Sequence, residues 1–249
     1  MKKISLLVMA FVLLLACEKP SDCLESSGAI VTKEVSVQPF KKIKVYRGIE
    51  VVITQGANYK VEIVAGENFI SNVEVIQNGD QLVFKDESSC NWVRAYGMIK
   101  ILVTTPTLEE VYSKTDRNIS SNGVLTFPSL TFTAFDKDAD GEAGAGTGDF
   151  ILNVDNESLT INNNNVSRFY LSGQTNNGSF NFYFGDGRIE AEQLTIQNLY
   201  VYHRGSNDMI VKPIQSLTGT LNSTGNVILK NVPPLIDVEE LYQGNVIYP

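Results

Sequence analysis

Period-two alternation of apolar and polar residues is the feature that most constrains how this chain can fold. From residue 40 onward the sequence consists of short runs rich in β-branched and aromatic residues, such as "KVEIVA" (60–65) and "VEVIQ" (73–77). Such alternation is typical of half-buried strands, and Gly or Asn separates the runs where a turn needs a positive φ. Asn78-Gly79 is the strongest single hairpin signal. The pattern predicts an all-β fold with almost no helix.

A loose repeat in the second half indicates how these strands are arranged. The stretches "SLTFTAF", "SLTINNN", "QLTIQNL" and "SLTGTLN" each contain a leucine that is expected to mark one rung, namely Leu130, Leu159, Leu194 and Leu217. A rung that cannot bury its apolar face alone stacks on the next, so we expect a solenoid built of short irregular strands. An ordinary antiparallel sandwich remains the alternative, because short alternating strands suit both folds.

The N-terminal residues indicate export and lipid attachment. Lys2 and Lys3 precede an apolar run at residues 4–16, and its 13 residues are too few for a membrane-spanning helix. The run ends in Leu14-Leu15-Ala16-Cys17, which resembles the bacterial lipobox, where cleavage leaves an acylated cysteine at the new N-terminus. We therefore expect a signal peptide at residues 1–16 and a lipid on Cys17. The alternative is an ordinary signal peptide followed by an incidental cysteine.

Residues 17–39 are expected to form a lipidated tether, and residues 40–249 the folded body. The tether opens with "EKPSDCLESSG" (18–28), which contains a proline, serines and charged residues but few apolar side chains that could pack in a core. Its acylated cysteine would hold the protein to a bacterial membrane of the cell envelope. We expect the outer membrane, and leave open whether the body faces the periplasm or the exterior. The strand-like stretch "AIVTKEVSV" (29–37) is expected to cap one end of the body.

The other two cysteines are expected to pair. Cys23 and Cys90 remain once Cys17 is assigned to lipid, and an exported protein meets an oxidising compartment. Their disulfide would close a loop of 68 residues and contribute about 4 kcal/mol in the chain-entropy model. Two unpaired thiols are the alternative, since spacing alone does not bring two Cα atoms together.

The charge of the chain bears on its partners. The formal net charge is −8, and loss of Lys2 and Lys3 with the signal peptide makes it −10. An acidic protein without a basic patch is a poor match for phosphate backbones, so we expect no nucleic-acid partner.

An acidic segment is the one stretch with metal-ligand spacing. Its carboxylates alternate as in the first half of a calcium loop, and Gly141 stands where such a loop turns sharply; they are Asp136, Asp138, Asp140 and Glu142. The twelfth position is Thr147 in place of a bidentate glutamate, which weakens the pattern. The prediction is therefore no cofactor and a solvated acidic turn, with calcium as the alternative.

Aromatic residues in successive strands suggest a binding surface. Half of an alternating set should face outward, and Tyr183 and Tyr202 are the residues we expect to face a ligand, either a glycan or a surface protein. The alternative is that each of them only fills the core or the surface. No nucleotide-binding, hydrolase or zinc-protease motif occurs, and we assign no catalytic residue. His203 and the pairs Asp186/Arg188 and Glu190/Glu192 are better explained by structural, turn and solvent-face roles.

The body resembles the auto-transporter adhesin family known as the head GIN domain. Four stretches carry this resemblance, at residues 40–70, 73–86, 144–154 and 205–233, among them "VEVIQNGDQLVFKD" and "GAGTGDFILNV". The resemblance spans residues 40–249. The resemblance implies an all-β, right-handed parallel β-helix-like solenoid and no established catalytic residues. The acidic stretch "FDKDADGEAG" (135–144) departs from the usual family pattern.

These features together predict a non-enzymatic, lipid-anchored protein of the cell envelope that acts as an adhesin or as a binding and display surface. The alternative is a carbohydrate-binding module or a polysaccharide-active enzyme on a β-helix scaffold.

Overall fold

The computed structural model describes residues 27–88, 99–137, 139–142 and 144–249. Within these residues, seventeen strands form one continuous hydrogen-bonded sheet, and the one helical segment is a 3-10 turn, η2 (Ile70–Asn72). The predicted all-β class is confirmed. No helix in the described ranges is long and apolar enough to span a membrane.

The strands vary from two to sixteen residues in length. In chain order they are β1 (Ile30–Val35), β2 (Lys42–Val45), β3 (Ile49–Gln55), β4 (Lys60–Gly66), β5 (Val73–Asn78), β6 (Gln81–Asp86), β7 (Ile99–Thr105), β8 (Glu110–Ser113), β9 (Ile119–Ser121), β10 (Ser129–Ala134), β11 (Phe150–Asn163), β12 (Arg168–Phe182), β13 (Arg188–His203), β14 (Met209–Leu221), β15 (Val227–Leu229), β16 (Leu235–Glu240) and β17 (Val246–Ile247).

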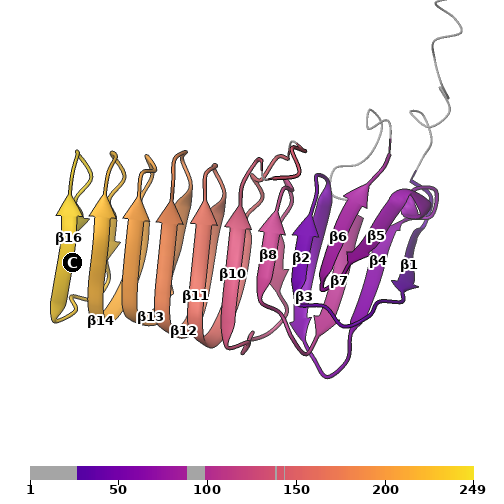
Figure 1. Ribbon diagram of the computed structural model, residues 1–249, viewed down its shortest axis with the longest axis horizontal. Helices are drawn as coiled ribbons and strands as arrows, with labels where there is room; N and C mark the ends of the chain where they lie inside the picture. Colours follow the sequence, from indigo (N-terminus) through magenta and orange to yellow (C-terminus); the bar gives the residue numbers. More distant parts are fainter. Residues whose placement is uncertain (1–26, 89–98, 138, 143) are drawn as a thin grey trace, which may run out of the picture.

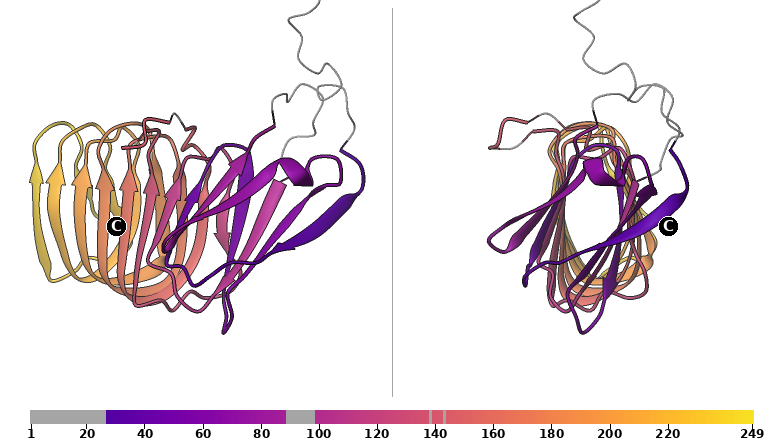
Figure 2. Two further views of the ribbon diagram at one scale, coloured as in Figure 1. Left: turned by 45° about the vertical axis from the view of Figure 1, so that its right-hand side comes forward. Right: turned by 90° about the vertical axis from the view of Figure 1, so that its right-hand side faces the viewer.

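The sheet folds into two walls that face each other across the core. Each of β11 to β14 runs along both walls, and these strands pair in parallel with their neighbours on either side. The first wall contains β2, β8, β10, the second halves of β11 to β14, and β16. The second wall contains β3, β7, β9, the first halves of β11 to β14, β15 and β17. Figure 1 shows the strands side by side along the long axis, and Figure 2 shows the oval outline of the stack viewed end-on.

The two ends of the stack differ. At the N-terminal end the pairing becomes antiparallel, because β4 pairs with β7, β1 pairs with β4, and β5 pairs with β6. Strand β1 therefore lies at this end, as the stretch 29–37 predicts (Figure 1). At the other end, β16 pairs only with β14 and β17 only with β15 among the described strands.

In-register columns of apolar residues build the core. Along the second wall, Phe150 pairs with Phe169, and their rings stack with centroids 4.6 Å apart and an interplanar angle of 10°. Both side chains are fully buried. Along the first wall, the corresponding inward column contains Val111, Phe132, Ile161, Phe180 and Val201. Successive side chains of a strand point to opposite faces, so the residues between them face outward.

The repeat marked by leucines is partly correct. Leu130 pairs with Leu159, and Leu217 pairs with Leu199, so these leucines do mark rungs of the first wall. Leu194 does not, because it lies in the first half of β13 and pairs with Gly173, whereas Leu199 is the residue of β13 in the column of Leu217.

Candidate functional site

The predicted ligand-facing tyrosines lie next to each other on the outside of the first wall. The ring centroids of Tyr183 and Tyr202 are 5.7 Å apart, with an interplanar angle of 47°. Tyr183 also contacts Phe135 edge-on at 5.7 Å, and Phe135 contacts Tyr112 edge-on at 6.2 Å. Residues that are 19 to 48 positions apart in the chain are thus neighbours in one row of rings, which we call the aromatic ladder (Tyr112, Phe135, Tyr183 and Tyr202).

The strand register explains the position of the aromatic ladder. Tyr112 and Tyr202 occupy outward positions of β8 and β13, whereas Phe135 and Tyr183 follow directly after β10 and β12. Tyr183 is 39% exposed, so much of its ring is open to a partner. An exposed aromatic ring offers apolar area at a small entropic cost, which is why tyrosine is common in binding surfaces.

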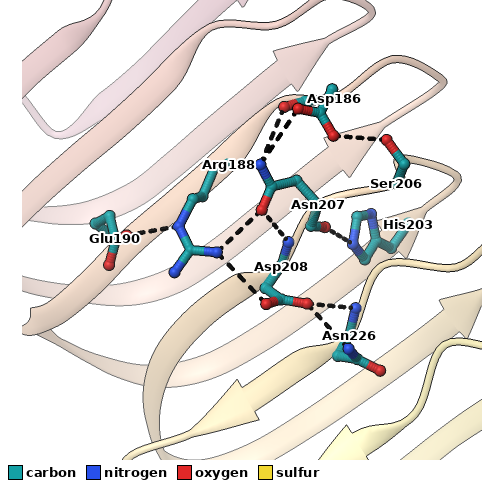
Figure 3. Close-up of polar contacts among 8 residues, drawn as sticks. All are labelled: Asp186, Arg188, Glu190, His203, Ser206, Asn207, Asp208 and Asn226. Carbon is teal, nitrogen blue, oxygen red and sulfur yellow. Dashed lines mark hydrogen bonds and ion pairs between the residues drawn. The ribbon is translucent and has the colours of Figure 1, made fainter.

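Apart from the aromatic ladder, a polar network fills the turns that follow β12, β13 and β14 (Figure 3). Asp186 accepts hydrogen bonds from Ser206 Oγ at 2.7 Å and from Asn207 Nδ2 at 3.4 Å. Asp208 accepts one from Asn226 Nδ2 at 3.0 Å. Each carboxylate therefore ties one turn to the next, which is a structural role.

Arg188 connects this network to the outer face of the second wall. Its Nε donates to Glu190 Oε1 at 2.6 Å, and its Nη1 donates to Asn207 Oδ1 at 3.0 Å (Figure 3). The hydrogen bond to Glu190 is the main cause that raises the pKa of the Arg188 guanidinium.

His203 is buried and has both ring nitrogens engaged. Its Nε2 lies 2.9 Å from the Asn207 carbonyl oxygen, and Gly205 N–H donates to its Nδ1 at 3.3 Å (Figure 3). Because Nδ1 accepts, Nε2 carries the proton and donates to Asn207. Burial lowers the pKa of His203, so the ring is held neutral as the cap of the following turn. Asn163, at the equivalent position two strands earlier, caps its own turn through Asn165.

The acidic segment folds back over the N-terminal part of the first wall. Asp140 Oδ1 accepts from the buried Lys114 Nζ at 2.7 Å, and its Oδ2 contacts Lys44 Nζ and the Tyr46 hydroxyl. Glu142 accepts from Lys85 Nζ at 2.9 Å. Burial, followed by the hydrogen bond to Asp140, raises the pKa of Tyr46 above its ordinary value. The acidic segment is thus held by lysines.

The lysine cluster around Tyr46 was not foreseen from the sequence. The Nζ atoms of Lys85, Lys114 and Lys44 lie 4.7, 5.2 and 5.5 Å from the centre of the Tyr46 ring. These lysines come from different strands or loops and have no common spacing, so only the folded chain brings them together.

The described residues leave the calcium alternative, the lipid on Cys17 and the disulfide between Cys23 and Cys90 untested. Among the described residues, no three Asp, Glu, His or Cys side chains gather in a way that could hold a metal ion. Asp136 contacts Asn165 Nδ2, and Asp138 lies outside the described residues, so the calcium alternative stays untested. Cys17, Cys23 and Cys90 also lie outside the described residues.

The described strands form an all-β stack, and the aromatic ladder lies on one of its walls. The chain belongs to the family described as "Putative auto-transporter adhesin, head GIN domain", whose sequence model matches residues 39–233. No curated protein matches the chain in sequence.

Solved structures share this fold at low sequence identity. A crystal structure of a "putative adhesin" from Bacteroides fragilis NCTC 9343 superposes with a TM-score of 0.77 at 20% identity, covering 89% of this chain and 97% of that one. A "putative adhesin" from Parabacteroides merdae ATCC 43184 gives 0.60 at 17% identity, covering 89% and 97%. A "Putative lipid binding protein" from Parabacteroides distasonis ATCC 8503 gives 0.62 at 15% identity, covering 88% and 97%. These similarities show that other bacterial proteins have the same fold.

Proposed function

We propose that the protein is a non-enzymatic, lipid-anchored component of the cell envelope that acts as an adhesin or binding surface. The observation that carries this proposal is the aromatic ladder, in which Tyr183 and Tyr202 stand with neighbouring rings on the outside of the first wall. Membership of an adhesin-described family supports the same role. The envelope location agrees with the solved relatives described as adhesins.

The proposal includes a right-handed parallel β-helix-like solenoid as the scaffold. The in-register parallel pairing of β11 with β12, β12 with β13 and β13 with β14 supports it. A scaffold of this kind holds its outward residues at fixed spacing, so a ligand would meet an ordered surface.

Adhesion of coated microspheres tests the binding role. Beads carrying the full-length protein in detergent would be applied to immobilised glycans, matrix proteins and bacterial envelope preparations. We expect retention on at least one surface, and loss of retention in the double variant Tyr183→Ala/Tyr202→Ala. The matched control is Tyr170→Ala, because Tyr170 is 38% exposed on the second wall. Equal retention by both variants would contradict the role of the aromatic ladder.

The anchor needs a separate experiment. Labelled palmitate fed to expressing cells should appear in the wild-type protein and be absent from the Cys17→Ala variant, which should also lose membrane association. Label that persists in Cys17→Ala would remove the lipid-anchor proposal.

A disulfide between Cys23 and Cys90 is also part of the proposal. Alkylation of the unfolded, unreduced protein should leave both thiols unmodified, whereas prior reduction should make both reactive. Alkylation without reduction would show two free thiols.

The carbohydrate-binding alternative has one observation in its favour. A groove of about 270 Å³ opens beside Tyr200 on the first wall, with serine and asparagine side chains around it. Product analysis after incubation with polysaccharides would separate binding from cleavage, and any shortened product would favour the polysaccharide-active enzyme.

A further inference from the structure

The outer face of the first wall carries an uninterrupted uncharged row. Thr131 of β10 pairs with Thr160 of β11, and the register continues through the next three strands. The row is Thr131, Thr160, Ser179, Tyr200 and Thr218. Every member carries a hydroxyl group, and neighbouring members are one strand spacing apart, roughly 4.8 Å. The fold therefore converts residues scattered over 88 positions into one line of hydroxyls.

A second uncharged row runs beside the first. It contains Asn162, Asn181, Tyr202 and Thr220. Asn181 Nδ2 donates to Asn162 Oδ1 at 3.1 Å, and the Tyr183 hydroxyl lies 3.5 Å from the same oxygen. This row joins the hydroxyl row to the aromatic ladder.

Charged residues limit the first row at both ends and the second row at its C-terminal end. Thr131 pairs with Glu110 on the N-terminal side, and Thr218 and Thr220 pair with Asp237 and Glu239 on the C-terminal side. The uncharged surface thus extends from β10 to β14.

The groove lies in the middle of this surface. It has a volume of about 270 Å³, close to the lower end for small-molecule sites, and Tyr200 forms part of it with 44% of its surface exposed. All side chains that line it are uncharged: Leu199 and the Tyr200 ring are apolar, and the polar ones include Asn177, Ser179, Asn198, Ser216 and Thr218.

We propose that this groove and the two rows bind a neutral oligosaccharide whose chain runs across the strands from β10 to β14. Hydroxyl and carboxamide groups both donate and accept, which matches sugar hydroxyls that do the same. The ring of Tyr200 supplies an apolar surface for the C–H face of one sugar, while Tyr202 and Tyr183 extend that surface. Because the groove offers no ammonium or guanidinium group, it has nothing with which to favour a sulfated or carboxylated sugar.

This inference rests on the proposed function and names its ligand class. It also assigns to Tyr200 a role that the sequence did not indicate, as the residue at the centre of the site. Tyr183 and Tyr202 then lie at its margin.

Calorimetric titration of the full-length protein in detergent tests the inference. The neutral probes are hexasaccharides of glucose, mannose and N-acetylglucosamine, and the acidic probes are hexagalacturonate and a chondroitin sulfate hexasaccharide. We expect at least one neutral probe to bind, and Tyr200→Ala to weaken its binding about tenfold or more. Tyr200→Phe should keep most of the affinity, because it keeps the ring. Tyr170→Ala, on the second wall, should have no effect.

A further variant guards against indirect effects. Thr218→Trp fills the groove without removing Tyr200, and it should abolish binding while leaving the thermal midpoint unchanged. Binding of acidic probes alone, no binding of any neutral probe, or neutral binding that Tyr200→Ala leaves intact would each overturn the inference. If neutral probes fail but bead adhesion still depends on Tyr183 and Tyr202, the inference fails and the proposed function stands. If adhesion is also absent, both fail.

Discussion

Lys114 Nζ lies 2.7 Å from Asp140 Oδ1, and the Lys114 side chain is completely buried. The same ammonium group donates to the Glu142 carbonyl oxygen at 2.6 Å. The Asp140 carboxylate of the acidic segment therefore neutralises the buried ammonium group of Lys114.

Removing the Asp140 carboxylate should destabilise the protein, because it leaves buried positive charge without this partner. We expect Asp140→Asn to lower the free energy of unfolding by about 2 kcal/mol, less than for a fully buried pair since Asp140 is 28% exposed. Urea unfolding followed by tryptophan fluorescence or circular dichroism measures the change. Glu109→Gln is the matched control, because its pair with Lys41 is about half exposed on both sides, and it should have no measurable effect. Equal effects of the two substitutions would show that Asp140 is an ordinary surface charge.

His203 should make stability depend on pH. Burial lowers its pKa in the folded state, so the unfolded chain binds more protons between that pKa and about 6.5. The contribution is fully present above pH 6.5 and is lost as the pH falls through the folded-state pKa. His203 is the only histidine, so one NMR signal reports its titration. His203→Asn copies the Asn163 arrangement and should remove this part of the pH dependence. A folded-state pKa at or above 6.5 would contradict the assignment.

Gly219 should not tolerate a side chain. Its φ is +133°, and an added Cβ would lie 1.8 Å from the Val201 carbonyl oxygen. We expect Gly219→Ala to cost about 3 kcal/mol or more in unfolding free energy, because backbone atoms of two paired strands must separate. Gly79→Ala is the control: its φ is +61° but its Cβ would meet nothing within 4 Å, so it should cost only about 1 kcal/mol. Similar midpoints in urea for both variants would refute the steric argument.

Calcium removal should leave the protein unchanged. The carboxylates of Asp140 and Glu142 already accept from Lys44, Lys114 and Lys85, and a calcium ion would have to displace these contacts. We expect the same thermal midpoint in EDTA and in millimolar calcium. A midpoint that rises with calcium concentration, and no longer rises in Asp136→Asn, would instead support a calcium loop in the acidic segment.

Much of the fold could be predicted from the sequence because its signals are local. Alternation identified the strands, and Asn78-Gly79 does close the hairpin of β5 and β6, with Gly79 at a φ of +61°. The register could not be predicted, since the local pattern around Leu194 looks like that around Leu159, yet Leu199 is the residue of β13 that stands in the column of Leu159.

The candidate site was only partly accessible from sequence. Tyr183 and Tyr202 were found because outward aromatics in neighbouring strands follow from alternation. The groove beside Tyr200 could not be found from the sequence. Its lining residues come from four strands, and their serines and asparagines look like ordinary turn or surface residues. The contact between Lys44 and Asp140 joins positions 96 apart, which no local pattern records.

The parallel register of β11 to β14 makes the molecule extensible. Each of these strands offers the same two edges to its neighbours, so an added or deleted rung between them would leave both ends unchanged and shift one relative to the other by roughly 4.8 Å. The number of rungs thus sets the length of the first wall, and with it the length of the surface that this wall presents outward.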